Sequence, residues 1–164
     1  MAISKGHDLH LITQKDIRMT KSRTASNQYL TGLFPENAIV VNAADGKRLG
    51  LKQGQKVKVV SATNPSGEWD LGNGVKKPII GRVQLTETIR PGVVTFTHGH
   101  GLWASGATDM VIDGILIKGD PRRAGGVNAN AAMWLDPHLK NTCMIDKVGG
   151  SVSFYDTKIR LVKV

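Results

Sequence analysis

The sequence predicts a mainly β protein built as a closed or partly closed barrel. Glycine is frequent, with 19 residues in 164, and aromatic residues make up only 5% of the chain. This composition is more typical of a loop-rich β protein than of a helical bundle. Strand patterns also follow one another at short spacing, with little helix between them. The length suits one domain, residues 1–164, which is large enough to bury a core.

The strand prediction is based on apolar alternation and on β-branched residues. The expected strands are, in chain order, 9–12, 38–41, 56–60, 81–86, 93–97, 151–155 and 158–164. Residues 61–78 are rich in Gly, Asn, Asp and Pro and are expected to form a long excursion without regular elements. The chain after Gly101 is expected to be polar and irregular.

One short helix is predicted directly after the second strand. Asn42 is a favourable N-cap for a helix over 43–49, and Asp45 lies in the first turn, where it interacts well with the helix dipole. Gly50 follows as the residue that ends the helix in a left-handed conformation. The sequence therefore predicts a unit of strand, short helix, turn and strand.

Composition and charge restrict the possible functions. The net charge of +9 favours an anionic partner such as nucleic acid, a phosphate-bearing cofactor or an acidic neighbouring protein. Basic residues are spread widely and aromatic residues are sparse, which disfavours a nucleic-acid-binding face. Cys143 is the only cysteine, so the chain has no intramolecular disulfide and no cysteine-built metal site. It also lacks an apolar run of membrane-helix length and a signal-peptide core.

A glycine-spaced histidine motif is the first candidate site. After the turn at Pro91–Gly92 and the strand 93–97, the chain continues into 98–101, a His-Gly-His-Gly sequence. Glycines lower the steric cost of unusual dihedral angles and allow a ligand close to the backbone. The alternative is a pair of turn glycines beside two surface histidines. No third ligand is evident for a metal at His98 and His100.

Two further segments carry polar groups suited to ligand binding. Residues 20–27 combine cations, hydroxyl groups and an amide, which are the donors that a diphosphate or polar heterocycle requires. Residues 120–132 contain two adjacent arginines and an Asn-x-Asn pair, whose amides both donate and accept. The alternatives are a solvated loop for the first segment, and turn closure with a helix cap at Ala131–Ala132 for the second.

In combination, the sequence motifs resemble the C-terminal molybdopterin-dinucleotide-binding domain of the dimethyl-sulfoxide-reductase family, and the likeness covers nearly the whole chain. The motifs that carry it are 42–51, 53–54, 57–59, 89–94 and 98–101. Within the family, the chain is most similar to the catalytic subunits of tetrathionate reductases, through 20–24, 64–74, 119–123 and 136–142. Arsenate and polysulfide reductases are close alternatives.

This resemblance implies a double-psi β-barrel of the aspartate-decarboxylase-like type with a few short helices. It implies binding of bis(molybdopterin guanine dinucleotide) with molybdenum or tungsten, in an enzyme of anaerobic respiration. The cofactor-binding residues carried over by motif are Lys21, Ser22, Arg23, Thr24, His98, Gly99, His100, Gly101, Asn128 and Asn130, with Thr13 and Gln14 as weaker candidates. No catalytic residue and no metal ligand is expected in this chain.

The resemblance also implies that further parts of the enzyme are needed. The iron–sulfur motif and the metal-ligating residue of such enzymes are absent from this sequence, so the chain is expected to be an excised C-terminal domain that is not catalytic alone. A separately encoded small subunit is the alternative. The expected partners are the remaining domains, together with one iron–sulfur electron-transfer subunit plus one membrane anchor subunit, with no nucleic acid. The whole enzyme is expected in the periplasm or at the outer face of the cytoplasmic membrane.

Two functions of other classes stay open. The chain is alternatively a stand-alone double-psi barrel that binds nucleic acid or protein. A self-processing decarboxylase would need a Gly-Ser cleavage site at a strand end, and the only such pair, Gly150–Ser151, lies too near the C-terminus. The isolated domain is also expected to expose an apolar docking face and to self-associate.

Overall fold

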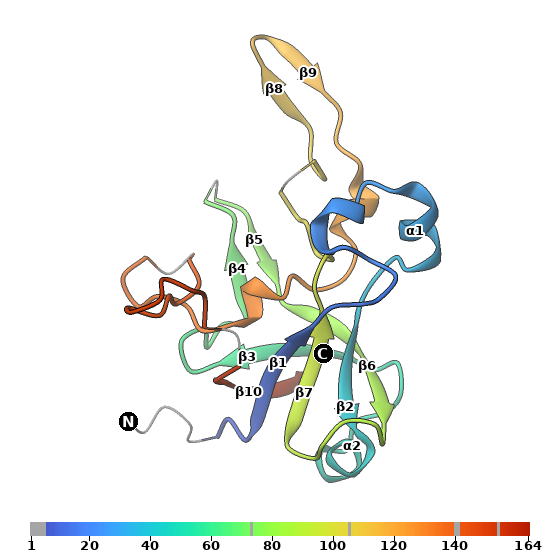
Figure 1. Cartoon of the computed structure of the whole chain (residues 1–164), viewed down its shortest axis with the longest axis vertical. Helices are drawn as coiled ribbons and strands as arrows, with labels where there is room; N and C mark the ends of the chain where they lie inside the picture. Colours follow the sequence, from blue (N-terminus) through green and yellow to red (C-terminus); the bar gives the residue numbers. More distant parts are fainter. Residues whose placement is uncertain (1–5, 73, 105, 140–141, 154) are drawn as a thin grey trace.

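A closed six-stranded barrel forms the centre of the molecule (Figure 1). The computed structural model describes residues 6–72, 74–104, 106–139, 142–153 and 155–164. Around the barrel the strands are β1 (Leu9–Gln14), β10 (Thr157–Lys163), β3 (Lys56–Ser61), β6 (Ile80–Thr86), β2 (Ala38–Asn42) and β7 (Val93–Thr97). The predicted mainly β, double-psi class of barrel with few short helices is confirmed.

Two parallel strand pairs determine where the loops of the barrel meet. β1 pairs in parallel with β7, and β2 pairs in parallel with β6, while the remaining neighbours are antiparallel. At the end of the first pair, Gln14 is opposite Thr97. Because parallel strands run in the same direction, the segments that follow β1 and β7 leave the barrel at the same edge.

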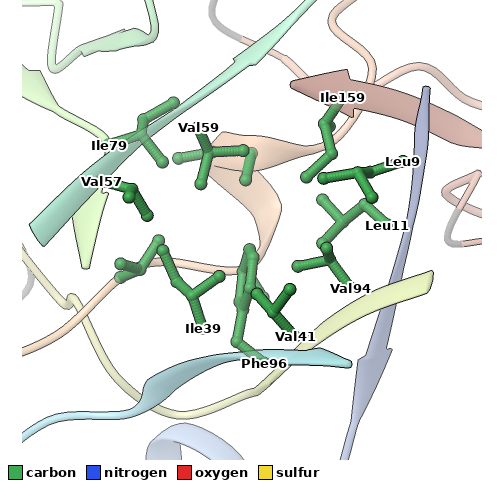
Figure 2. Close-up of a cluster of buried hydrophobic side chains, with 14 of the residues drawn as sticks. Leu9, Leu11, Ile39, Val41, Val57, Val59, Ile79, Val94, Phe96 and Ile159 are labelled. Carbon is green, nitrogen blue, oxygen red and sulfur yellow. The ribbon is translucent and has the colours of Figure 1, made fainter. Parts of the chain in front are cut away.

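The barrel interior is filled by side chains from all six strands (Figure 2). Along β1, Leu9 and Leu11 are fully buried while the residues between and after them are not, as expected for a strand with one face inward. Phe96 is the largest fully buried side chain. Burying a side chain of this kind contributes roughly 1.5–3 kcal/mol each, so this cluster is the main source of barrel stability.

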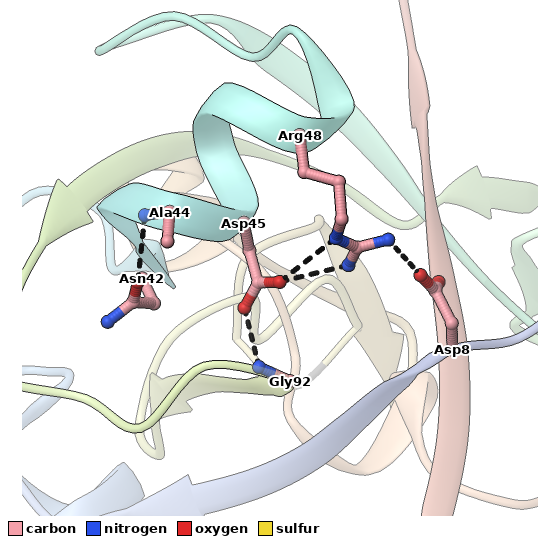
Figure 3. A network of polar contacts seen from close by, with 6 residues as sticks. All are labelled: Asp8, Asn42, Ala44, Asp45, Arg48 and Gly92. Atoms are coloured by element: carbon pink, nitrogen blue, oxygen red, sulfur yellow. Dashed lines mark hydrogen bonds and ion pairs between the residues drawn. The ribbon is translucent and has the colours of Figure 1, made fainter.

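The predicted helix is confirmed as α2 (Ala43–Leu49), with both of its predicted caps. The Asn42 side-chain oxygen accepts a hydrogen bond from the Ala44 amide at 2.8 Å, and Gly50 is left-handed with φ of 63°. Asp45 accepts hydrogen bonds from the Gly92 amide and from Arg48, which also pairs with Asp8 (Figure 3). This network ties α2 to the turn before β7, at the opposite end of the barrel from the segments that follow β1 and β7 (Figure 1).

The smaller elements lie in the loops. They are the single-turn helices η1 (Lys21–Thr24), η2 (Pro121–Ala124) and η3 (Asn130–Ala132), the helix α1 (Gln28–Leu33), and the hairpins β4 (Glu68–Asp70) with β5 (Lys76–Pro78) and β8 (Met110–Ile112) with β9 (Ile115–Ile117). Among the described residues, no helix has the length and apolar content required to cross a bilayer.

Three expectations about the loops were wrong. Residues 61–78 contain the β4–β5 hairpin, and the chain after Gly101 contains the apolar β8–β9 hairpin. Residues 151–155, of which 154 lies outside the described residues, form no strand but only one bridge, between Val152 and Ile145. The Ser153 hydroxyl instead donates to Asp156 at 2.6 Å, because a serine side chain competes with regular backbone pairing.

Candidate functional site

The candidate site forms where the chain leaves β1 and β7. Beyond the last pair of the parallel ladder, the His98 amide donates to the Gln14 carbonyl oxygen at 3.0 Å. This bond holds the start of the His-Gly-His-Gly loop against the end of β1, from which residues 15–24 continue into η1. Two of the segments singled out from the sequence therefore lie side by side, although about 75 residues separate them along the chain.

The two glycines of this loop are the points at which it touches its neighbours. Gly99 has φ of +96°, and a β-carbon there would lie 2.7 Å from the Lys21 carbonyl oxygen. Gly101 has φ of +64°, and a β-carbon there would lie 2.3 Å from the Asn128 amide nitrogen. The sequence suggested that these glycines admit a ligand. In the structure, the space that they free is filled by backbone of the two other site segments.

The third segment, residues 120–132, is attached through asparagines. The Asn128 side chain donates to the Gly101 carbonyl oxygen at 3.1 Å and accepts from the Asn130 amide at 3.0 Å. The Gly101 amide donates to the Gly125 carbonyl oxygen at 2.7 Å. Asn128 thus acts here in loop closure, which was the alternative role for these asparagines, and it does so beside the cavity described below.

A buried asparagine that the sequence analysis missed connects the same segments. Asn37 donates to the carbonyl oxygens of Thr97 and Val127, at 2.7 and 3.0 Å, and accepts from the Val127 amide at 2.8 Å. The side chain lies next to Gly126, where a β-carbon would come within 2.5 Å of it. The only signal in the sequence is an asparagine directly before the apolar strand 38–41, a position that is equally common in turns.

The three segments enclose a cavity of about 260 Å³. The residues that line it are Lys21, His98, Gly99, His100, Leu102, Asn128, Ala129 and Asn130. Six of the ten residues predicted as a site are therefore brought together in one place. Of the other four, Gly101 is buried, Arg23 is exposed, and the Thr24 hydroxyl donates to the Lys21 carbonyl oxygen within η1. Ser22 lies in η1, and its side chain is outside the described part of the structure.

A second cavity, of about 360 Å³, adjoins the first and shares Lys21 and His98 with it. It is lined by Thr13, Gln14, Lys15, Lys21, His98 and Tyr155. Thr13 and Gln14 were the weaker candidates from the sequence, whereas Lys15 and Tyr155 were missed. Lys15 could have been found from its position, because it is the first basic residue after the strand that ends in Gln14.

The two cavities have a positive electrostatic character. Lys15 and Lys21 contribute cations, and among the described residues no Asp or Glu lines either cavity. Burial lowers the pKa of His98 below its ordinary value of 6.5, and the charges of Lys21 and Lys15 lower it further. His98 is therefore neutral at pH 7, and an anion bound between the lysines would raise its pKa again.

His100 is buried at the wall of the first cavity with one nitrogen atom committed. Its Nε2 lies 3.2 Å from the Phe34 carbonyl oxygen, which can only accept, so this contact favours the tautomer with the proton on Nε2. Its Nδ1 has no hydrogen-bond partner within the part of the chain that the structure describes. An acceptor without a partner, beside amide groups and a lysine, suits a heterocyclic ligand with donors on its edge.

The segment between β1 and η1 is held by an ion pair. Arg18 donates from Nε to Asp16 at 2.7 Å and lies over the Phe34 ring, 3.7 Å from its centroid. The bonds from Arg18 lower the pKa of Asp16 to about 2. Asp16 therefore stays ionised across the physiological range and keeps Arg18 beside the same Phe34 whose carbonyl contacts His100.

Fold and cavity together define a β-barrel domain with a cationic, amide-lined ligand site at one end. Residues 9–145 match the family described as the molydopterin dinucleotide binding domain, and the chain belongs to this family. Through it the chain belongs to the molybdopterin oxidoreductases of the dimethyl-sulfoxide-reductase family, as the motifs indicated. Membership implies a molybdopterin guanine dinucleotide cofactor with molybdenum, and the lysines, amides and unpaired His100 nitrogen fit its diphosphate and pterin parts.

Two curated relatives extend the family assignment, and each is the large subunit of a reductase. The chain is 41% identical over 158 residues to that of the selenate reductase of Mesobacillus selenatarsenatis, with 96% of this chain and 15% of the relative covered. It is 31% identical over 145 residues to that of the tetrathionate reductase of Salmonella typhimurium, with 87% of this chain and 13% of the relative covered. The chain thus spans only about a seventh of the length of these relatives.

A solved structure shares the fold. Acetylene hydratase from Pelobacter acetylenicus superposes with a TM-score of 0.63 at 14% sequence identity, over 98% of this chain and 19% of that protein. At this identity the likeness concerns the fold alone. Within the described part of the chain, no three His, Cys, Asp or Glu side chains lie close enough together to hold a metal ion.

Proposed function

We propose that the chain is the C-terminal cofactor-binding domain of a larger molybdenum oxidoreductase and is not catalytic by itself. The observation that carries the proposal is the assembly of Lys21, His98, His100 and Asn130 around one cavity, from segments that the family motifs had identified. The short share of the curated relatives that the chain covers supports a larger catalytic subunit.

The residues of the cavities have separate roles in this proposal. Lys15 and Lys21 bind the diphosphate by charge-assisted hydrogen bonds, and neutral His98 between them supplies a further donor. His100 and the Asn130 side chain bind the polar edge of a pterin, while Gly99 and Gly101 hold the three segments together. When bound, the cofactor supplies redox chemistry at its metal, and hydrogen bonds from the protein tune it.

For the substrate of the whole enzyme, we propose an oxyanion of selenium or sulfur. The sequence motifs favoured a tetrathionate reductase. The identity to the selenate reductase is higher, at 41% against 31%, so a selenate-type oxyanion takes first place and tetrathionate second. Use in anaerobic respiration, partner subunits that carry iron–sulfur clusters or anchor the enzyme to the membrane, and a periplasmic or outer-face location follow from the family resemblance as part of the same proposal.

Cofactor content of the catalytic subunit tests the site. We expect Lys21→Ala to lower the bound molybdenum and the guanine nucleotide released by acid, because the diphosphate loses a cation. Lys52→Ala is the matched control, since Lys52 is an exposed lysine in the turn after α2, at the other end of the barrel. Equal cofactor content in the Lys21→Ala and Lys52→Ala proteins would show that the site is wrongly placed.

Activity of the loaded enzyme then separates the two substrates. The enzyme is assayed with selenate and with tetrathionate, using a reduced dye as electron donor. Faster turnover of selenate supports the first assignment, and faster turnover of tetrathionate supports the second. Reduction of neither compound by an enzyme that carries its cofactor would exclude both.

A further inference from the structure

The β8–β9 hairpin is a long apolar arm that projects away from the barrel (Figure 1). Its six strand residues, Met110, Val111, Ile112, Ile115, Leu116 and Ile117, are between 39% and 68% exposed. Val111 and Leu116 form a cross-strand pair on one face, and the pairs on either side of them lie on the opposite face. Both faces of the arm are thus apolar and exposed, unlike a hairpin that packs one face on a core.

The arm is held firmly at both ends. Asp113 and Gly114 at the tip both have positive φ, 51° and 78°, as the tightest hairpin turns require. At the base, Lys118 pairs with Asp109 at 2.7 Å, and the Asp120 amide donates to the Gly106 carbonyl oxygen at 2.8 Å. An isolated two-stranded ribbon is only marginally stable in water, so an arm of this kind requires a partner surface to be ordered.

The charge and hydrogen bonding of the arm indicate what the partner is. Between 110 and 117 the only charged residue is Asp113, although the chain carries 22 lysines and arginines. An arm without basic residues does not suit nucleic acid or an anionic lipid surface. A lipid core is also unsuitable, since the open edges of a two-stranded ribbon would leave backbone groups without partners there. An apolar protein groove buries both faces and can pair the edges.

The position of the arm indicates where that groove lies. The two segments that lead into and out of it are bonded to each other by the Leu102 amide and the Arg123 carbonyl oxygen at 3.1 Å, and by Gly101 and Gly125. Leu102, Gly101 and Asn128 belong to the loops that form the first cavity or support it. The arm therefore rises from the end of the barrel that carries the candidate cofactor site.

We propose that the β8–β9 arm inserts into an apolar groove of the remaining domains of the same catalytic subunit, which it fastens over the cofactor end of the barrel. This inference rests on the proposed function, because it requires the larger polypeptide. A groove in the same polypeptide is favoured over one in a second copy, since linkage gives it a high effective concentration. The arm then sets the position of the barrel relative to the rest of the enzyme.

Photo-crosslinking in the whole catalytic subunit tests the proposal. Val111 is replaced by p-benzoylphenylalanine, and Val148, which is 97% exposed and outside the arm, receives the same replacement as a control. We expect position 111 to crosslink to peptides of the same polypeptide outside this domain, and position 148 not to yield those products. Crosslinks from position 111 to another protein, a second copy or lipid, or no crosslinks at all, would overturn the proposal.

Hydrogen exchange gives a second readout without a substitution in the arm. Amides of residues 110–117 should exchange at least about tenfold more slowly in the whole subunit than in the 164-residue chain. Equal exchange would overturn the proposal. Molybdenum and guanine nucleotide are measured in the same preparations. A loaded enzyme with an exposed arm refutes only this inference, whereas an enzyme that never binds the cofactor refutes the proposed function.

Discussion

Gly99 lies so close to Lys21 that a β-carbon at position 99 would come within 2.7 Å of the Lys21 carbonyl oxygen. We expect Gly99→Ala to lower the free energy of unfolding by about 2–3 kcal/mol, from positive φ together with a backbone clash. Gly54→Ala is the matched control, because Gly54 has φ of +74° with open space around it, and it should cost only about 1 kcal/mol. Urea unfolding measures both, and equal losses would show that the contact with Lys21 contributes nothing.

Replacing Asn37 tests the connection between β7 and the segment around Val127. Asn37→Ala leaves two carbonyl oxygens and one amide without their partner, so we expect a loss of about 2–4 kcal/mol. The same change at Asn27, which caps α1 at the surface, should cost only about 1 kcal/mol. Chemical denaturation compares the two variants. An Asn37→Ala protein as stable as the Asn27→Ala protein would contradict this assignment.

The depressed pKa of His98 predicts a pH effect with a definite sign. Since the folded protein binds this proton less readily than the unfolded chain, the stability contribution is full above about pH 6.5 and falls as the pH drops through the folded-state pKa. NMR titration of the imidazole should show Lys21→Ala moving the His98 pKa upward. Lys52→Ala should leave it unchanged, and an upward shift in that control as well would point to a global rather than local effect.

Binding of a guanine nucleotide diphosphate tests whether the cofactor surface is preformed. In an NMR titration of the chain with GDP, we expect shifts confined to 21–24, 98–101 and 128–130, decreasing with added salt. Binding should also raise the His98 pKa, because a diphosphate offsets the charges of Lys21 and Lys15. No shifts at millimolar GDP would mean that other domains complete the site or that it lies elsewhere.

The exposed arm predicts self-association of the chain in isolation. At high concentration the chain should form oligomers in light scattering, and Val111→Lys with Leu116→Lys should make it monomeric. Val148→Lys, also at an exposed valine but outside the arm, should not prevent association. A monomeric unmodified chain at high concentration would count against exposed apolar surface as a docking face.

Local sequence signals predicted most of the barrel strands and α2, because their causes are local. Alternation along β1, β-branched residues in β7 and the capping groups of α2 each act over a few residues. The β8–β9 hairpin was missed, although Asp113–Gly114 between two apolar runs is a strong hairpin signal. It was overlooked because all six flanking residues are apolar, without the alternation that marks a strand with one buried face.

The sequence by itself determined the strand and helix content, the excess of positive charge and the three polar segments of the candidate site. Only the tertiary structure decided that these segments meet, because the parallel pairing of β1 with β7 joins residues about 80 positions apart. It also decided that Asn37 holds the site together, and that Gly99 and Gly101 make room for backbone. These are long-range contacts, and no pattern within a few residues of any one segment encodes its distant partner.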